Sequence, residues 1–332
     1  MPTAAKPSRK RPAGYRRPKT NTKKRGQISI VGAGRLGTAL GRALRLAGYQ
    51  IKLVVTKRLA TARRASSFIG RNPLSASAGG SGRLEGPARD RLLQSDLIII
   101  STPDDTLAAV ARQLSEIFRS EDPAVRRRKR RVVLHTSGAI ASGVLKPLRT
   151  SGIAIGSLHP LVSVADGNVP AEIFRGVHFC LEGDREAVRA ARSLVTDLRG
   201  HSFTIDANSK ALYHAAAVMS AGHVVALFDV AIEMLAKCGL SRRRAREILL
   251  PLLNSTTANL STKTTAQALT GPFARGDFET AKKHLEAIKA SRIEESLAVY
   301  VSLGRRALKL AAALSGDSVQ SHRIAKLLSS RT

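Results

Sequence analysis

The chain has 332 residues, of which 43% are apolar, and this is enough for two domains that each bury a core. Its longest apolar runs, such as 97–100 and 215–221, fall far short of the roughly 20 residues that span a bilayer. We therefore expect no transmembrane segment, no secretory signal peptide and a cytoplasmic location. Cys180 and Cys238 lie far apart and predict buried free thiols, with neither a disulfide framework nor a metal site.

The formal net charge of +31 would suit a nucleic-acid partner, but much of it is concentrated in two segments. Residues 1–26 contain ten basic residues and no acid, and residues 126–131 are all basic. With Tyr15 as its only large apolar or aromatic side chain after Met1, segment 1–26 predicts a disordered arm. A solubilising extension is favoured over nucleic-acid contact by this arm, because such charge blocks are commonly solvated. Like charges should also keep 126–131 exposed.

From Gln27 onward, short apolar runs alternate with helical stretches, which is typical of βαβ units around a parallel sheet. The expected strands are 27–31, 51–55, 96–101, 132–135, 153–158 and 177–181. Residues 72–82 are rich in Gly, Ser and Ala and predict a surface loop. The expected fold of residues 27–207 is thus a doubly wound α/β domain with a mostly parallel sheet.

Strand signals stop after about Asp206, and residues 208–332 predict an all-α C-terminal domain. Residues 208–238 indicate one long apolar helix, with Asn208 as its N-cap and Gly239 as its C-terminal stop. Further helices are expected over 241–253, 280–289 and 293–314.

Gly32, Gly34 and Gly37 fit the spacing G-x-G-x-x-G, directly after the first expected strand and at the start of an expected helix. In this context the pattern indicates a dinucleotide-binding Rossmann domain. Gly32 would make the tight turn, Gly34 would let the pyrophosphate approach the backbone, and Gly37 would let helix and strand pack closely. The helix N-terminus, with Arg35 and Leu36, would bind the phosphates.

The second expected strand ends in Thr56, Lys57 and Arg58, where an NAD enzyme of this fold usually carries an acidic residue. The first acid of the chain is Glu85. Two cations and a hydroxyl suit the 2′-phosphate of NADP, so NADP (NADPH) is favoured over NAD. The alternative is that Lys57 and Arg58 are ordinary surface cations.

Polar loops follow the next two strands. Thr102 and Pro103 follow strand 96–101, and Ser137 follows strand 132–135. Since ligands lie across the carboxyl ends of parallel strands, these loops should line the nicotinamide and substrate side. At least one of the two aspartates at 104 and 105 should cap the following helix.

Six motifs together resemble the bacterial Rossmann-like proteins with a C-terminal DUF2520 domain. They are VGAGRLG at 31–37, TPDD at 102–105, HTSGA at 135–139, HPL at 159–161, YHAAAV at 213–218 and LTGPFARGD at 269–277. That family is similar in layout to ketopantoate reductase, pyrroline-carboxylate reductase and prephenate dehydrogenase, and its C-terminal domain is 6-phosphogluconate-dehydrogenase-like. The resemblance implies a two-domain NAD(P)-dependent oxidoreductase, often a homodimer through the helical domain, and leaves the substrate open.

Lys210 and His214 are four residues apart in the expected helix and share one face. Relatives of ketopantoate reductase carry a lysine and, four residues on, an asparagine there, so the resemblance makes Lys210 the candidate proton donor. A surface lysine at a helix start is the alternative. Ala221 and Gly222 stand where family members commonly have Ser-Asn, which leaves Ser220 as the nearest polar substitute for binding substrate.

His159 resembles the His-Pro element of prephenate dehydrogenases and is a third catalytic candidate; the alternative is a structural histidine bonded to a backbone carbonyl. Arg275 either binds a substrate carboxylate or pairs with Asp277. The leading hypothesis is NADP-dependent hydride transfer to the carbonyl or imine of a small carboxylate-bearing substrate. The alternative is a non-catalytic dinucleotide sensor whose basic arm binds nucleic acid.

Overall fold

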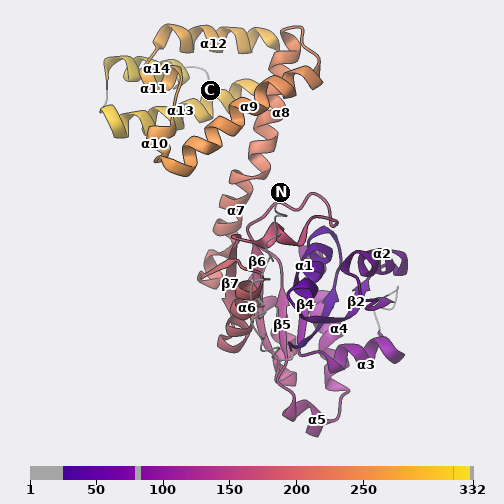
Figure 1. Ribbon diagram of the computed structural model, residues 1–332. Helices are drawn as coiled ribbons and strands as arrows, with labels where there is room; N and C mark the ends of the chain where they lie inside the picture. The colour runs from indigo at the N-terminus through magenta and orange to yellow at the C-terminus, as the bar shows by residue number, and fades with distance from the viewer. Residues whose placement is uncertain (1–24, 79–83, 317, 330–332) are drawn as a thin grey trace, which may run out of the picture. The chain divides into compact units, whose positions relative to one another are not determined.

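The computed structural model describes residues 25–78, 84–316 and 318–329 (Figure 1). Its contacts divide the chain into a first unit that ends at Ala215 and a second that begins at Ala216, whereas the sequence places the boundary between residues 207 and 208. The predicted arm, residues 1–26, lies outside the described residues as far as residue 24.

The first unit is built on an eight-stranded sheet with the order β3-β2-β1-β4-β5-β6-β7-β8. The strands are β1 (Gln27–Val31), β2 (Gln50–Thr56), β3 (Leu74–Ser77), β4 (Leu97–Ile100), β5 (Val132–His135), β6 (Ala154–Pro160), β7 (His178–Gly183) and β8 (His201–Thr204). Neighbouring strands are parallel except β6 and β7, which are antiparallel. The predicted doubly wound, mostly parallel architecture is confirmed.

Helices cover both faces of this sheet (Figure 1). One face carries α1 (Arg35–Leu46), α2 (Leu59–Ile69) and α6 (Arg185–Asp197), and the other carries α3 (Gly86–Gln94), α4 (Leu107–Arg119) and the 3₁₀ segment η2 (Ser142–Ser151). In β4, Ile99 packs in the first layer and Ile98 and Ile100 in the second, because successive strand side chains point to opposite faces. Burial on both faces explains the continuous apolar runs of the sequence.

Two short edge strands were not predicted from the sequence pattern. The loop predicted over 72–82 was wrong for Leu74–Ser77, which form β3 and pair in parallel with β2; residues 79–83 lie outside the described part. β8 was not predicted at all. Each strand has at most one fully buried side chain among its four residues, so neither carries a strong apolar signal.

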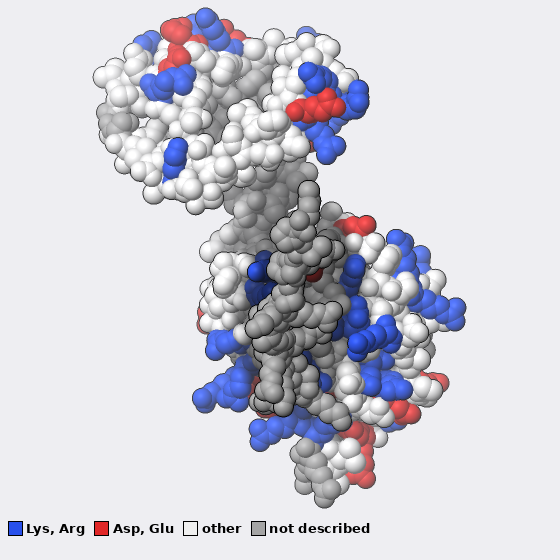
Figure 2. All heavy atoms as spheres, viewed as in Figure 1, with Lys and Arg blue, Asp and Glu red and all other residues white. Residues whose placement is uncertain are grey.

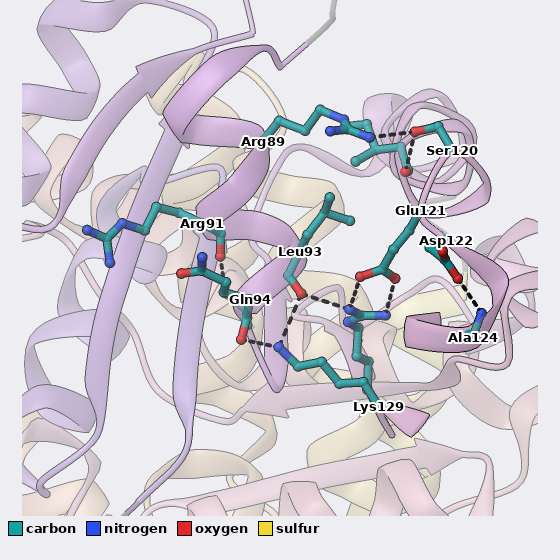
Figure 3. Close-up of polar contacts among 12 residues, drawn as sticks. Arg89, Arg91, Leu93, Gln94, Ser120, Glu121, Asp122, Ala124 and Lys129 are labelled. Carbon is teal, nitrogen blue, oxygen red and sulfur yellow. Dashed lines mark hydrogen bonds and ion pairs between the residues drawn. The ribbon is translucent and has the colours of Figure 1, made fainter. Parts of the chain in front are cut away.

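Basic side chains are scattered over the visible surface of the first unit (Figure 2), but the basic run before β5 is not wholly exposed. Arg131 is 1% exposed, and its guanidinium donates to both carboxylate oxygens of Glu121 at 2.6 and 2.7 Å. The backbone carbonyl of Leu93 accepts from Arg131 at 2.8 Å and from Lys129 at 3.1 Å, and that of Gln94 also accepts from Lys129 (Figure 3). These two carbonyls belong to the last turn of α3, where backbone carbonyls have no hydrogen-bond partner within the helix. The expectation that like charges keep the run exposed was wrong for Arg131.

Short helical segments connect the larger elements of the first unit. They are η1 (Asp104–Thr106), α5 (Pro123–Arg128), η3 (Ala171–Phe174) and η4 (Ala207–Ser209). Neither Asp104 nor Asp105 caps the helix that follows, so that prediction was wrong. Asp206 accepts the Asn208 N–H at 2.8 Å and caps η4, in the place where the sequence suggested Asn208 as the cap.

The division between the two units falls within α7 (Lys210–Ser220), and all described elements of the second unit are helical. They are α8 (Gly222–Lys237), α9 (Arg242–Thr262), α10 (Thr265–Ala268), α11 (Pro272–Arg275), α12 (Phe278–Ser291), α13 (Ser296–Ser315) and α14 (Val319–Ser329). The single helix predicted over 208–238 was wrong, since Ala221 leaves helical geometry (φ −127°, ψ −74°) beside Gly222, a residue of low helix propensity.

The second unit leaves much of its apolar surface exposed. Its small core joins α12, α13 and α14 through Ala281, Leu285, Val301, Leu308, Ile324 and Leu328. By contrast, α8 and α9 each bury a single residue, Ile232 and Ala245, although both are long helices with many apolar side chains. Cys238 is also exposed, so the prediction of a buried thiol was wrong there and right for Cys180.

Among the described residues, one helical stretch, Ala207–Lys237, is long and apolar enough to cross a membrane, and 6% of its most apolar window is buried in the structure. No such segment was expected from the sequence, because uninterrupted apolar runs such as 215–221 are far shorter than the roughly 20 residues that span a bilayer. Length and composition alone do not distinguish a membrane span from an apolar helix that packs against another protein chain.

Candidate dinucleotide and catalytic site

The three fingerprint glycines have distinct geometric roles. Gly32 has φ +87°, and a Cβ there would lie 2.6 Å from the carbonyl carbon of Ser101. A Cβ on Gly37 would lie 2.4 Å from the Gly32 carbonyl oxygen, which reflects the close approach of α1 to the turn after β1. A Cβ on Gly34, in contrast, would have no neighbour within 4 Å. Gly32 and Gly37 are thus required by the fold itself, whereas the space over Gly34 is open to a ligand.

The start of α1 fits an anionic group. Its N-cap is Gly34, and no side chain caps the first-turn N–H groups, which point out of the helix end with the positive end of its dipole. Next to this turn, Oγ1 of Thr102 is buried and has no hydrogen-bond partner within the described structure. Unpaired donors beside an open glycine are what a dinucleotide pyrophosphate requires.

The loop after β6 packs on the first half of α1, a relationship that the sequence did not indicate. Arg35 is exposed, and its guanidinium donates to the carbonyl of Ala165 at 3.4 Å. A Cβ on Gly167 would lie 3.3 Å from Cβ of Thr38. Leu36, also a predicted cofactor contact, is half-buried against the core beneath the helix. The side chain of Arg35 is therefore directed at the loop, while its N–H belongs to the anion-binding turn.

The end of β2 presents two exposed cations, Lys57 and Arg58. Thr56 is buried, and its hydroxyl donates to the carbonyl of Arg58 at 2.6 Å. Because the threonine proton is engaged in this turn, the hydroxyl is less suited to a phosphate than the sequence suggested, and the two cations carry the case for the 2′-phosphate.

Lys210 is buried, which excludes a surface lysine at a helix start. Its side chain is 1% exposed, and Nζ donates to the carbonyl of Ser137 at 3.0 Å and to Oγ of Ser157 at 3.0 Å. Ser137 follows the end of β5, and Ser157 of β6 pairs with His135, the last residue of β5, so both partners lie toward the sheet edge that also carries the glycine turn. Burial lowers the pKa of Lys210, and no carboxylate among the described residues lies within ion-pair distance of it.

A cluster of rings adjoins this lysine. The Tyr213 hydroxyl lies 2.7 Å from Nδ1 of His159, and the ring of His214 meets the ring of His159 edge-on with centroids 5.5 Å apart. Burial, followed by the charge of Lys210, lowers the pKa of His159 to about 4. His159 is therefore neutral at pH 7, and its Nδ1 shares a hydrogen bond with the tyrosine hydroxyl, so its partner is a phenol and not the backbone carbonyl considered above.

His159 lies inside β6, opposite Cys180 of β7, whereas the sequence placed it just after the strand. It shares a face with Ser157 two residues earlier, since strand side chains alternate. Tyr213 was missed as a site residue, although its spacing from Lys210 places it on the same helix face. Nδ1 of His214 is buried without a partner within the described structure.

The hydroxyl of Ser137 is occupied by the local fold. It donates to Asp104 at 2.9 Å and accepts the N–H groups of Ala139 and Ile140 at 3.2 and 3.0 Å. His135, two residues earlier, is buried, and burial followed by the charge of Lys210 lowers its pKa to about 3. The loop after β5 is thus held rigidly. Its backbone groups, rather than the Ser137 hydroxyl, remain available to bind a ligand.

The other predicted substrate residues belong to the second unit. Arg275 is exposed at the end of α11, and no ion pair joins it to Asp277 in the described structure. Asp277 instead accepts from the N–H and the hydroxyl of Thr280 at 3.0 and 2.7 Å, which caps α12 and lowers the pKa of Asp277. Ser220 is exposed, and its hydroxyl donates to the Ala217 carbonyl at 3.1 Å.

The glycine turn, the doubly wound sheet and the polar cluster at its carboxyl edge define a Rossmann-type dinucleotide-binding protein. Residues 15–160 match the family model of the Rossmann-like domain, and residues 177–307 match that of a domain of unknown function, DUF2520. The chain thus matches both domain models of the family that its motifs resemble.

Solved structures share this fold at low sequence identity. A Bacteroides fragilis protein assigned as an NADP oxidoreductase is 20% identical with a TM-score of 0.64, and the match covers 86% of this chain and 99% of that one. A Thermotoga maritima protein is 20% identical with a TM-score of 0.63, over 87% and 99%. A reductive aminase from Aspergillus terreus, in complex with NADPH and ethyl levulinate, is 18% identical with a TM-score of 0.57, over 91% and 99%. No curated protein matches the sequence.

Proposed function

We propose that this protein is an NADP-dependent oxidoreductase that transfers a hydride between the nicotinamide and the carbonyl or imine carbon of a small carboxylate-bearing substrate. The observation that carries the proposal is Lys210. A lysine that is 1% exposed, lacks a carboxylate partner and sits at the ligand-binding edge of a Rossmann sheet costs stability. A chemical role explains why such a group is present.

The residues around the glycine turn fit NADP. The first-turn N–H groups of α1 and the open space at Gly34 suit the pyrophosphate, Thr102 and Pro103 the nicotinamide side, and Lys57 and Arg58 the 2′-phosphate. The reductive aminase that shares the fold holds NADPH. When bound, the cofactor supplies the hydride, and this chain's own residues must supply the proton and the orientation.

Lys210 is suited to move that proton. Burial lowers its pKa toward the range where a lysine gives up a proton readily, and its two hydrogen bonds fix Nζ at the edge of the sheet. The neutral pair of His159 and Tyr213, with His214 beside it, would orient the substrate and return the proton. Arg275 and Ser220 would bind the substrate carboxylate from the helical domain.

A substrate screen tests the proposal. The NADPH-saturated protein is heated with 2-oxo acids, cyclic imino acids and oxo acid–amine mixtures, because a bound substrate raises the thermal midpoint. Compounds that stabilise it are then assayed for NADPH oxidation, with Lys210→Met as the matched inactive control. Oxidation by wild type alone supports the proposal. Tight NADPH binding with no substrate turned over would instead favour the dinucleotide sensor, for which Gly222 in place of the family's Asn is the motivating feature.

We also propose that the protein is a cytoplasmic homodimer held through its helical domain. Exposed apolar side chains on α8 and α9 include Val225 (70%), Ile248 (45%) and Leu252 (63%), and a second copy would bury them. The same interface would cover the apolar stretch 207–237 without a membrane. Sedimentation equilibrium should give a dimer, and Val225→Glu with Leu252→Glu should give monomers; a wild-type monomer would contradict the proposal.

A further inference from the structure

A second pocket lies at the opposite edge of the sheet from the glycine turn. Its volume of about 570 Å³ is in the range of ordinary ligand pockets. It is formed where α1 and α2 end and where β2 and β3 begin. In parallel βαβ units these ends lie at the amino edge of the sheet, so the pocket is separate from the dinucleotide site at the carboxyl edge.

The walls of this pocket are strongly basic. Among the described residues, no acid lines it, and four cations do: Arg45, Lys52, Arg71 and Arg91. They come from the last turn of α1, from β2, from the loop after α2 and from the last turn of α3. Figure 3 shows the Arg91 side chain extending away from the polar contacts that fix the end of α3. Four cations from different parts of the sequence thus converge on one hollow.

Lys52 lies at an irregularity in β2. Ile28 and Ser29 of β1 pair with Ile51 and Leu53, so Lys52 has no partner in β1. Ile51 and Leu53 consequently pack in opposite core layers, although residues two apart in a regular strand share a face. An inserted residue of this kind re-aims side chains and is frequent next to functional sites. An interior strand of the sheet thus carries a half-buried lysine at the wall of the pocket.

The loop after α2 has a second irregularity at the same wall. Arg71 and Asn72 have φ of +60° and +46°, a left-handed conformation that costs energy for a side chain such as arginine. Both residues line the pocket. Two separate departures from regular backbone geometry therefore each place a cation at this hollow.

The protein does not neutralise these cations. Within the described residues, none of the four has a carboxylate within 4.0 Å, since the ion pairs there involve other arginines. The side chains of Lys52, Arg71 and Arg91 also make no hydrogen bond to a described residue. Arg45 donates to the carbonyl of Ile69, which uses part of its guanidinium for the fold. Most of the donors at this wall are thus available to a ligand.

Other negative charge at this edge is too small to balance four cations. Asp197 accepts from the hydroxyl of the wall residue Tyr49 at 2.6 Å, but its carboxylate is paired with Arg25 at 3.0 Å. The last carbonyls of α3 accept from Lys129 and Arg131. The C-terminal ends of α1 and α2 contribute roughly half a negative charge each and so offset about one cation. About three positive charges therefore remain for a ligand.

We propose that this amino-edge pocket, lined by Arg45, Lys52, Arg71 and Arg91, binds a diphosphate group, either as free pyrophosphate or as part of a small ester. Guanidinium and ammonium groups bind phosphate oxygens through short, charge-assisted hydrogen bonds. One phosphate group carries about −1.5 to −2 charges at pH 7, so about three unpaired cations are matched by two such groups. The site is independent of the proposed reductase activity, because it lies at the other edge of the sheet.

The test measures pyrophosphate binding by two variants of the full chain that lose the same charge. The pocket variant keeps Arg45, which bonds Ile69, and carries Lys52→Gln, Arg71→Gln and Arg91→Gln. The control changes three exposed arginines of α6 at the far end of the sheet order: Arg185→Gln, Arg189→Gln and Arg192→Gln. Inorganic pyrophosphate is titrated into each protein by calorimetry in magnesium-free buffer. Thermal midpoints establish that both variants are folded.

Three further titrations separate the pocket from other sources of anion binding. Gly34→Val fills the open space at the glycine turn, the proposed place of the dinucleotide pyrophosphate, and is titrated with pyrophosphate. Citrate, titrated into wild type, presents carboxylates instead of phosphates. ADP, titrated into Gly34→Val, compares a diphosphate ester with the free anion.

The pocket variant should bind pyrophosphate at least about tenfold more weakly than wild type, since a single charge-assisted contact contributes about that factor. The control and Gly34→Val should bind it like wild type, and citrate should bind more weakly. Tighter binding of ADP than of pyrophosphate would identify an ester as the occupant, and the reverse would identify the free anion. No binding by wild type, equal losses in the pocket and control variants, or a loss in Gly34→Val alone would overturn the proposal. Equal affinities for citrate and pyrophosphate would overturn the assignment to a diphosphate.

Discussion

Nζ of Lys210 lies 3.0 Å from Oγ of Ser157, so the first residue of α7 is bonded to strand β6, at a residue 53 positions earlier in the chain. The charge on that nitrogen is buried against a hydroxyl and a carbonyl instead of a carboxylate. Such an arrangement destabilises the ammonium form and favours release of its proton.

Removing this amine should abolish chemistry while sparing the fold. Lys210→Met should lower kcat by about 100-fold to 10,000-fold, with NADPH affinity near wild type, because a proton donor acts in the transition state. Since the pKa of the lysine is lowered on folding, its charge opposes folding at neutral pH, and the thermal midpoint of the variant should not fall. Single-turnover kinetics and a melting curve check both points. Full turnover in the variant would move the proton donor to His159 or His214.

Arg275→Ala should behave differently. An anchor for a carboxylate holds ground state and transition state alike, so the variant should raise KM and leave kcat nearly unchanged. Arg275→Lys keeps the charge but loses the planar fork, and should recover only part of the affinity. Steady-state kinetics on the substrate from the screen would decide this, and an unchanged KM would remove Arg275 from the site.

His135, which is buried, and His159, which is half-buried, predict a pH dependence of stability. The pKa of His159 is lowered to about 4 and that of His135 to about 3, from an ordinary value near 6.5. As pH falls from 6.5 through 4 toward 3, the unfolded chain takes up protons that the folded chain does not, so stability should be lost over that window. His159→Gln should flatten the fall in thermal midpoint between pH 6.5 and 4, whereas the same change at the exposed His201 should not. Parallel curves for wild type and His159→Gln would refute the burial argument.

The structure places the boundary for deleting the basic arm at the start of the chain more precisely than the sequence does. Arg25 pairs with Asp197 and donates to the carbonyl of Ala47, so it belongs to the fold. Removing residues 1–24 should leave the thermal midpoint nearly unchanged, and Arg25→Ala in the truncated chain should cost about 1 kcal/mol, the upper range for partly exposed ion pairs. Chemical denaturation measures both. A large loss from the first deletion would show that residues before Arg25 contribute to the folded domain.

Most of the sheet could be predicted because its strands are buried on both faces and read as apolar runs. Leu74–Ser77 and His201–Thr204 could not, since edge strands are half-covered and carry little apolar signal. The glycine turn was predictable because steric demands at Gly32 and Gly37 leave no alternative residue. The burial of Arg131 was not, because its partner Glu121 lies ten residues earlier, before α5, and local charge patterns do not reveal this pairing.

At the candidate catalytic site, Lys210, His214 and His159 were predictable from helix spacing and motif resemblance. The roles of Ser157 and Tyr213 depend on packing between α7 and β6, which no local pattern encodes. Ser137 was predicted to bind substrate, and nothing in the sequence indicated that its hydroxyl bonds Asp104 and two backbone N–H groups.

Gly34 offers a clean probe of the cofactor site. A side chain there meets nothing within 4 Å, and its φ of −71° suits any residue, so Gly34→Val should fold normally. The added methyl groups would occupy the space that the pyrophosphate needs. We expect the melting temperature to be unchanged and NADPH binding to fall at least about 100-fold, a loss of about 2.7 kcal/mol. Undiminished binding would place the cofactor elsewhere.

The central claim is that this Rossmann domain binds NADP, and calorimetric titration of the wild-type protein with NADPH and with NADH tests it most directly. Lys57 and Arg58 occupy the end of β2 where an acid would favour the bare ribose. We predict that NADPH binds at least about tenfold more tightly than NADH, a difference of about 1.4 kcal/mol that one charge-assisted contact can supply. Equal affinities for the two cofactors, or no binding of either, would contradict the account.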